Sequence, residues 1–130
     1  MANAETAIYS ILSNDSTLTA IIGTKLFPVV AEQGAANPLV VFSIISERPT
    51  NAMGVDINPV ESTIQISCYS DTGAQALSIK DAVKNALQRY QGTSGGVVVQ
   101  DIFYENQRAD YDGELKEHRR DLDFRVYFEE

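Results

Sequence analysis

Residues 61–90 show the most regular alternation of apolar and polar positions in the chain, and they predict one strand followed directly by one helix. In Glu61–Tyr69 the even positions Ile64, Ile66 and Cys68 are apolar, and the odd positions are polar except for the terminal tyrosine. This is the period of a strand with one face on a core and the other in water. Apolar residues then recur at helical spacing, at Ala76, Ile79, Val83, Ala86, Leu87 and Tyr90. The apolar strand face and the helical stripe are expected to pack against each other.

The ends of this helix are marked by residues that favour caps. Thr72 and Gln75 match a capping box, in which the threonine oxygen accepts from the backbone N–H of Gln75 and the glutamine reaches back. Gly92 lies just beyond the stripe, where a left-handed residue readily ends a helix. We therefore expect a helix over residues 72–91.

Two shorter helices are predicted near the N-terminus. Ala4–Leu12 has apolar residues on one face and Asn3 in the cap position. Ser16–Ile22 is preceded by Asp15, a good N-cap, and followed by Gly23. We expect a tandem pair of short helices.

The other segments predict strands and loops. Leu26–Pro28 is expected to be extended because the residue before a proline avoids the helical region. Leu39–Ser46 is rich in β-branched and aromatic residues with little alternation, which predicts a central strand covered on both faces. Residues 49–59 hold two prolines, two asparagines and a glycine and predict a long loop, and 92–96 predict a flexible turn.

Residues 97–111 and 116–128 predict two long strands joined as a hairpin. The Asp-Gly pair at 112–113 favours a two-residue type I′ turn, which would pair Tyr111 with Glu114. The same register would place Asp101 on the core side, so we expect a β-bulge near it. It also predicts two cross-strand ion pairs, Arg108 with Glu117 and Glu105 with Arg120.

Together these elements predict a single α+β domain over residues 1–130. We expect a mostly antiparallel sheet of about four main strands, one long helix across a face, and a short N-terminal helical pair.

Composition and charge exclude several classes of function. The chain has 18 acidic and 10 basic residues, a net charge of −8, and the acidic excess lies toward both ends. A nucleic-acid grip needs a basic stripe, so specific DNA binding is not expected. No apolar run approaches the roughly 20 residues that cross a bilayer, and the first residues do not match a signal peptide, so a cytoplasmic origin is expected.

No catalytic, cofactor or metal site is expected. The lone histidine, His118, is read as a surface residue, and Cys68 as a buried, inert thiol. The glycines of 92–96 leave a helix instead of entering one, so they do not match a phosphate-binding loop. The acidic residues of 110–117 lack the EF-hand spacing. The basic residues of 116–120 either complete cross-strand pairs or dock on an acidic patch of a neighbouring subunit.

Several segments resemble one known family over nearly the whole chain. The segments are Ile8–Gly23, Leu26–Pro28, Gly34–Phe42, Ile64–Tyr69 with the helix that holds Ala76, Leu77 and Val83, and the closing Phe124–Phe128. They resemble the tail completion, or tail-to-head joining, proteins of long-tailed bacteriophages. The resemblance implies a non-enzymatic virion subunit that is made in the host cytoplasm and forms a ring, expected to be a hexamer, at the head-proximal end of the tail. Its implied partners are copies of itself, the tail tube protein and the head connector, with DNA passing through without specific binding.

Subunits of such a ring meet through loops and sheet edges. We expect these contacts in the 49–59 segment and at the tip of the 105–120 hairpin. Deleting residues 51–58 should then abolish ring formation and leave the monomer folded. The candidate interface residues are Asn51, Met53, Val55, Ile57, Arg108, Tyr111, Lys116 and Arg119. The alternative function is a dimeric α+β regulatory module that binds a small ligand in an apolar pocket.

Overall fold

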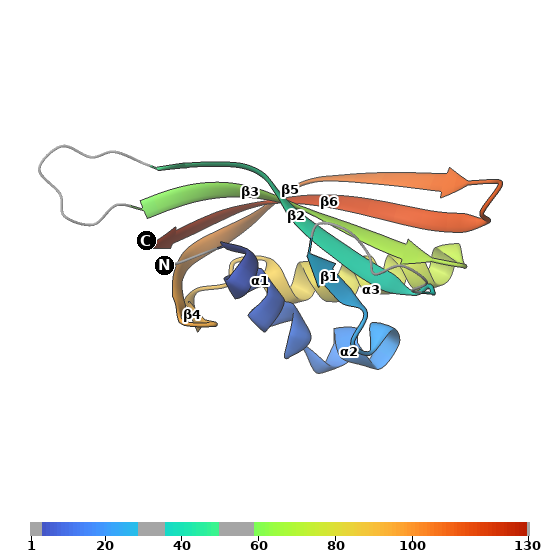
Figure 1. Cartoon of the computed structure of the whole chain (residues 1–130), viewed down its shortest axis with the longest axis horizontal. Coiled ribbons are helices and arrows are strands. Elements are labelled where there is room, and N and C mark those ends of the chain that lie inside the picture. The colour runs from blue at the N-terminus through green and yellow to red at the C-terminus, as the bar shows by residue number, and fades with distance from the viewer. Residues whose placement is uncertain (1–3, 29–35, 50–58, 130) are drawn as a thin grey trace, which may run out of the picture.

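The chain folds into one curled sheet with three helices on one face (Figure 1). The structure, a computed structural model, describes residues 4–28, 36–49 and 59–129. Over these residues the elements are α1 Ala4–Ser13, α2 Ser16–Ile22, β1 Leu26–Pro28, β2 Leu39–Pro49, β3 Pro59–Ser70, α3 Gly73–Leu87, β4 Gly92–Ser94, β5 Val97–Asp112 and β6 Glu117–Glu129. No helix among the described residues is long and apolar enough to cross a membrane.

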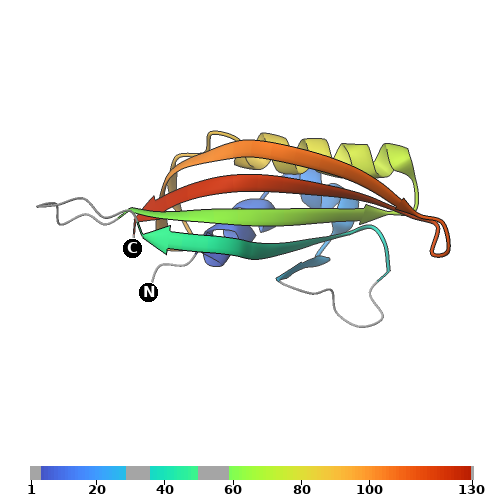
Figure 2. The ribbon, with the colours of Figure 1, turned by 90° about the horizontal axis from the view of Figure 1, so that it is seen from above.

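The sheet has the strand order β1-β2-β3-β6-β5-β4 over the described residues. β1 pairs with β2 in parallel, and all other neighbouring pairs are antiparallel. β3 and β5 both run antiparallel to β6 and are joined through α3, which lies behind the sheet in Figure 2. This crossover is right-handed, as the twist of β-strands favours.

The predicted fold class is wrong in its sheet and in its helices. The sheet is mixed and six-stranded, not mostly antiparallel with four strands, and it curls partway toward a barrel (Figure 1). The three helices have 10, 7 and 15 residues, so no single long helix dominates. The strand missed from the sequence is β4, which pairs with Val97–Val99 where a flexible turn was expected.

The core lies between the helices and the sheet. Ile64 and Ile66 of β3 are fully buried and stand opposite Phe124 and Leu122 of β6. The buried stripe of α3 packs against them and contains Ala76, Ile79, Ala82, Val83 and Leu87. The strand and helix predicted over residues 61–90 therefore form and pack together, because burial on one side follows both periodicities.

The caps of α3 match the sequence at one end only. Thr72 accepts a 3.1 Å hydrogen bond from the backbone N–H of Gln75, as predicted. The Ser70 hydroxyl replaces the second half of the capping box: it accepts from the backbone N–H of Thr72 and donates to the Gln75 side chain at 2.6 Å. At the C-terminus the left-handed residue is Arg89 (φ +62°), two residues after the helix ends, and Gly92 instead begins β4.

The N-terminal helices agree more closely with the sequence. Asp15 accepts a 3.2 Å hydrogen bond from the N–H of Leu18, and Gly23 (φ +63°) ends α2 by donating to Thr19 O. Asn3, the expected cap of the first helix, lies outside the described residues. The helices sit on the same side of the sheet as α3 (Figure 1).

The β5–β6 hairpin forms, but its predicted turn and register are wrong. Asp112 pairs with Glu117, which leaves a four-residue loop in which Lys116 takes the left-handed conformation (φ +52°). The Asp112 carboxylate accepts hydrogen bonds from the backbone N–H groups of Glu114 and Leu115 at 3.0 and 3.2 Å. This side-chain turn replaces the type I′ turn.

The altered register also replaces both predicted ion pairs. Arg108 bonds to Asp123 at 3.1 Å, and Glu105 bonds to Arg125 at 2.7 Å. The bulge expected near Asp101 is confirmed, since the register shifts between Val99 and Asp101.

The expectation that β2 is covered on both faces is wrong. Val40 and Phe42 are buried under the helices, whereas Val41 and Ser43 on the other face are only half-buried. A register shift between Ile44 and Ser46 then leaves Ile45 58% exposed.

Candidate assembly surface

Figure 2 views the side of the sheet away from the helices. This side carries polar and charged residues of β2, β3, β5 and β6 and is the candidate surface. We call it the open face. It follows the odd positions of β3 and β6 and the residues paired with them, since the even positions face the core. By register its residues include Leu39, Val41, Ser43, Ser46, Arg48, Glu61, Thr63, Gln65, Ser67, Tyr69, Asp101, Phe103, Asn106, Arg108, Asp110, Arg119, Asp121, Asp123, Arg125 and Tyr127.

Arg125 joins three strands at one end of the open face. Its Nε lies 2.7 Å from a carboxylate oxygen of Glu105 on β5 and 3.4 Å from one of Glu61 on β3. A hydrogen bond with Tyr127, and after it the charge of Glu105, raises the pKa of Arg125 above its ordinary value. Arg48 reaches the same Glu61 from β2 at 3.6 Å.

Asp121 is the buried charge of the open face. It is 8% exposed, accepts a 2.7 Å hydrogen bond from the Ser67 hydroxyl, and lies 2.8 Å from Nε of Arg119. The hydrogen bond that Arg119 donates to Asp121 is the main cause that raises the pKa of Arg119. The Arg119 guanidinium also lies 5.5 Å from the centre of the Tyr69 ring.

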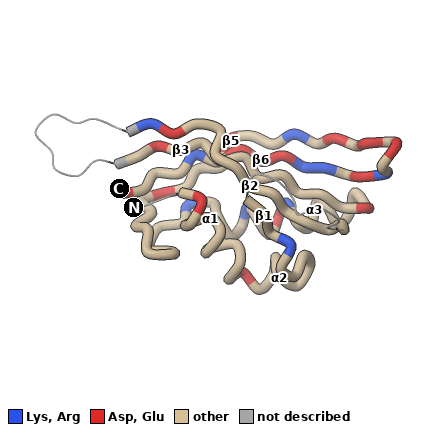
Figure 3. Tube along the Cα trace, viewed as in Figure 1, with Lys and Arg blue, Asp and Glu red and all other residues tan. Residues whose placement is uncertain are grey.

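Acidic and basic residues are interspersed along β5 and β6 (Figure 3). Each arginine of the described face, Arg48, Arg108, Arg119 and Arg125, has a carboxylate within 4 Å. A guanidinium that is already paired has less to gain from a phosphate, because the pair must first be broken. The face is wet and mixed in charge and does not form a basic stripe of the kind that grips nucleic acid.

The predicted interface residues on the hairpin lie at its exposed end. Arg108 and Tyr111 belong to β5, Lys116 to the turn and Arg119 to β6. Tyr111 is 52% exposed and its ring lies 4.6 Å from that of His118, centre to centre. The other four predicted residues, Asn51, Met53, Val55 and Ile57, lie outside the described residues.

Sequence reasoning missed Leu115, which is 69% exposed in the hairpin turn. Its signal was one apolar residue among the charged residues of 112–117. The basic residues nearby do not form a free cluster: Arg119 bonds to Asp121, and Arg120 donates to the Gln107 side chain at 3.3 Å.

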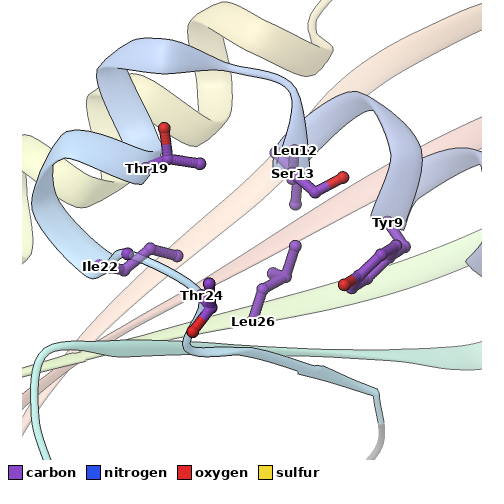
Figure 4. A pocket seen from close by; sticks show the side chains of 8 residues that line it. Tyr9, Leu12, Ser13, Thr19, Ile22, Thr24 and Leu26 are labelled. Carbon is purple, nitrogen blue, oxygen red and sulfur yellow. The ribbon is translucent and has the colours of Figure 1, made fainter.

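A separate hollow lies between α1, α2 and β1, with a volume of about 390 Å³. Figure 4 shows Tyr9, Leu12 and Ser13 on one side of it and Thr24 and Leu26 on the other. None of the described residues that line it is charged. Its lining combines apolar side chains with the hydroxyl-bearing residues Tyr9, Ser13, Thr19 and Thr24, a composition that small-molecule sites commonly have.

The described residues offer neither a metal-binding cluster nor an accessible thiol. They contain no group of three or more His, Cys, Asp or Glu side chains that could hold a metal ion. Cys68 is fully buried, and burial raises the pKa of its thiol far above the ordinary value. The thiol is therefore protonated and shielded at neutral pH.

Comparisons with known proteins agree with the fold and identify a family. One solved structure, a chain in the "Virion of native gene transfer agent (GTA) particle", superposes with a TM-score of 0.78. The two sequences are 23% identical, and the match covers 98% of this chain and 95% of the other. No curated protein sequence matches. The family model for "Tail completion protein gp17" matches residues 6–129, and the chain belongs to that family of phage tail proteins.

Proposed function

We propose that this protein is a ring-forming subunit that completes the head-proximal end of a phage-type tail. Its partners would be further copies of itself, the tail tube protein and the head connector, and its location would be the assembled virion. Two findings support this: the chain belongs to a tail completion family, and a chain with the same fold is part of a gene transfer agent virion. Six copies is the number that the family resemblance implies.

The observation that carries the proposal is the open face. One side of the sheet is closed by helices, and the other is broad, polar and internally ion-paired. A channel for DNA requires such a lining, because free cations would hold the phosphates and large apolar patches would collapse onto each other. We propose that DNA passes along this face without specific binding.

We also propose that subunit or partner contacts involve the exposed hairpin end and the segment after β2. The hairpin contributes Arg108, Tyr111, Lys116 and Arg119. Residues Asn51, Met53, Val55 and Ile57 remain candidates on sequence grounds alone.

Size-exclusion chromatography with light scattering tests the ring. The expected result is a ring-sized oligomer, or a monomer that joins a ring only when purified tail tubes are added. A tight dimer whose melting temperature rises with a small ligand would contradict the proposal and favour a ligand-binding module. The hollow between α1 and α2 is where such a ligand would be expected to bind.

Charge-removal variants test the lining. Asp123→Asn removes the partner of Arg108, and Glu61→Gln weakens the pairing of Arg48 and Arg125. We expect the double variant to retain DNA in a low-salt gel shift more than the unmodified protein does. Asp81→Asn is the control: it removes one carboxylate from the exposed side of α3, which is not part of the open face. Equal retention by all three proteins would contradict a DNA-facing role for the open face.

A further inference from the structure

The long strands β2 and β5 lie next to the edges of the sheet, and the short edge strands β1 and β4 pair with only three residues of each. β1 pairs with Val40–Phe42 of β2, and β4 pairs with Val97–Val99 of β5. One more backbone hydrogen bond reaches β5, from the N–H of Arg89 to Ile102 O at 2.7 Å. Beyond these contacts no described strand lies beside Ser43–Pro49 of β2 or Tyr104–Asp112 of β5. Strand edges of this length offer unpaired N–H and C=O groups to another chain.

The two free edges fit each other in direction. β2 runs antiparallel to β3, β3 to β6, and β6 to β5, so β5 runs antiparallel to β2. In a ring each copy is related to the next by rotation alone, which brings the β5 edge of one copy beside the β2 edge of its neighbour. When the strands lie roughly along the ring axis, this pairing is antiparallel.

The free edges are also offset along the strands by an amount that a barrel requires. Followed onto β6 by the register, Ser43–Pro49 of β2 is centred between Arg125 and Val126, whereas Tyr104–Asp112 of β5 is centred between Arg120 and Asp121. The offset is five residues, or about 16 Å along the strands. Four strand spacings separate β2 from the β2 of the next copy, about 19 Å. An offset of 16 Å over 19 Å corresponds to a strand tilt of about 40°, within the range of about 35–45° found in closed barrels.

The direction of the offset decides which face points inward. Barrel strands wind in a right-handed sense because β-strands twist that way. Seen from outside with the strands upright, the copy on the right is therefore shifted upward, and seen from inside it is shifted downward. Figure 2 views the open face: with the hairpin tip turned upward, β5 is the left edge with its free part high, and β2 is the right edge with its free part low. The free parts of β5 and β2 in neighbouring copies therefore meet only if the open face points to the inside of the ring.

We propose that neighbouring copies join by antiparallel pairing of Tyr104–Asp112 of β5 with Ser43–Pro49 of β2, with the open face lining the channel and the helices outside. This inference rests on the proposed ring and adds its subunit interface. A second copy of this chain in head-to-tail contact satisfies direction, offset and handedness together. Because each copy offers one edge of each kind, the contact closes into a ring without a residual pair of edges.

Cysteine crosslinking tests the pairing directly. The variant carries Ser46→Cys and Arg108→Cys, two exposed positions on the same face of the two edges. A short bismaleimide should link copies into a ladder that ends at the number of subunits in the ring. Each single variant can link at most two copies, and the pair Ser46→Cys with Ser78→Cys, which places the second thiol on exposed α3, should give no ladder. The native Cys68 is fully buried and does not compete.

The outcomes separate the interface from the ring. The crosslinking is carried out on the protein alone if light scattering shows an oligomer, and otherwise after addition of tail tubes. A ladder from the Ser46/Arg108 pair supports the edge pairing. A ring-sized oligomer without that ladder overturns the edge pairing and leaves the proposed function standing. A protein that stays monomeric under both conditions overturns the ring and the pairing together.

Hydrogen exchange gives a second, label-free measurement on the unmodified chain. In Ser43–Arg48 and Tyr104–Asp112, the backbone amides that point away from the neighbouring strand of the same chain should exchange fast in the monomer. They should be protected from exchange in the oligomer. The matched internal control is β3, whose amides already lie between two strands and should change little. Protection that appears only on the helices would overturn the pairing.

Discussion

The Ser67 hydroxyl donates a 2.7 Å hydrogen bond to Asp121 across the β3–β6 pair, on the face of the sheet away from the helices. Both side chains are buried although that face carries no helix, because Arg119 lies against Asp121 and Tyr69. The open face thus has a small polar core of its own. This arrangement adds a buried polar link between the two central strands, β3 and β6.

Removing the Asp121 carboxylate is expected to destabilise the fold more than removing a neighbouring one. Asp121→Ala leaves the buried Ser67 hydroxyl without its acceptor and Arg119 without its partner, which should lower the free energy of unfolding by about 2 kcal/mol. Asp123→Ala removes a carboxylate whose partner, Arg108, is half exposed, so about 0–1 kcal/mol is expected. Urea unfolding measures both values. Equal losses would show that burial of Asp121 adds nothing.

The N-cap of α3 is a second contribution to the stability of the fold that can be measured. Thr72→Ala removes the acceptor of the Gln75 N–H and should cost about 1 kcal/mol of stability. Ser78→Ala, an exposed residue inside the same helix, is the matched control and should stay within about 0.5 kcal/mol of the unmodified chain. Thermal unfolding followed by circular dichroism reports both. A loss from Ser78→Ala as large as from Thr72→Ala would contradict the cap as the cause.

Two adjacent glycines in the turn between β4 and β5 separate backbone strain from contact with α1. Gly95 (φ +59°) and Gly96 (φ +78°) both have left-handed backbones, so alanine at either should cost about 1 kcal/mol. A Cβ at Gly95 would also lie 3.0 Å from Thr6 Cγ2 and 3.1 Å from Thr6 O, whereas one at Gly96 meets nothing within 4 Å. Gly95→Ala should therefore cost about 1–3 kcal/mol more than Gly96→Ala in urea unfolding. Equal costs would mean that α1 moves aside freely.

The parts of the fold that depend on regular burial could be predicted from the sequence. Ile64, Ile66 and Cys68 alternate in the sequence and are all fully buried, and the stripe of α3 follows its 3.6-residue period. β4 has only three residues and no periodicity of its own, so its pairing is set by β5 and not by its own sequence. The parallel pairing of the equally short β1 with β2 depends in the same way on tertiary contacts.

The candidate surface was predictable in its polarity but not in its partners. The polar odd positions of β3 and β6 already indicate a wet face. The ion pairs depend on register, and the register depends on how Asp112 turns its side chain into the hairpin loop. The turn is centred two residues further along the chain than predicted, which moves the register partner of Arg108 from Glu117 to Asp121 and its ion pair to Asp123. An Asp-Gly pair is compatible both with a type I′ backbone turn and with a turn held by the aspartate side chain. The residue types alone therefore do not predict which of the two turns forms.

The single thiol should be inert in the folded protein. Cys68 is fully buried, and burial followed by the nearby charge of Asp121 raises the pKa of its thiol, so very little thiolate exists at about pH 8. A disulfide reagent such as 5,5′-dithiobis(2-nitrobenzoate) should label the native chain slowly and the urea-unfolded chain at once. Because the folded-state pKa is raised, raising the pH to about 9 should speed labelling of the unfolded chain far more than of the native one. Rapid labelling of the native protein, with its circular dichroism unchanged, would contradict this burial.

Two isoleucines distinguish the core from the free edge of β2. Ile64 is fully buried opposite Phe124, and Ile64→Ala should lower the free energy of unfolding by about 2–5 kcal/mol because it leaves a cavity. Ile45 lies at the register shift of β2 and is 58% exposed, so Ile45→Ala should change monomer stability by less than about 0.5 kcal/mol. Urea unfolding of the monomer at low protein concentration measures both. If the β2 edge meets a neighbouring copy, Ile45→Ala should also shift assembly to higher protein concentration in light scattering, since its side chain then loses contacts only in the ring. A strong loss of monomer stability from Ile45→Ala would show instead that this edge is already covered within one chain.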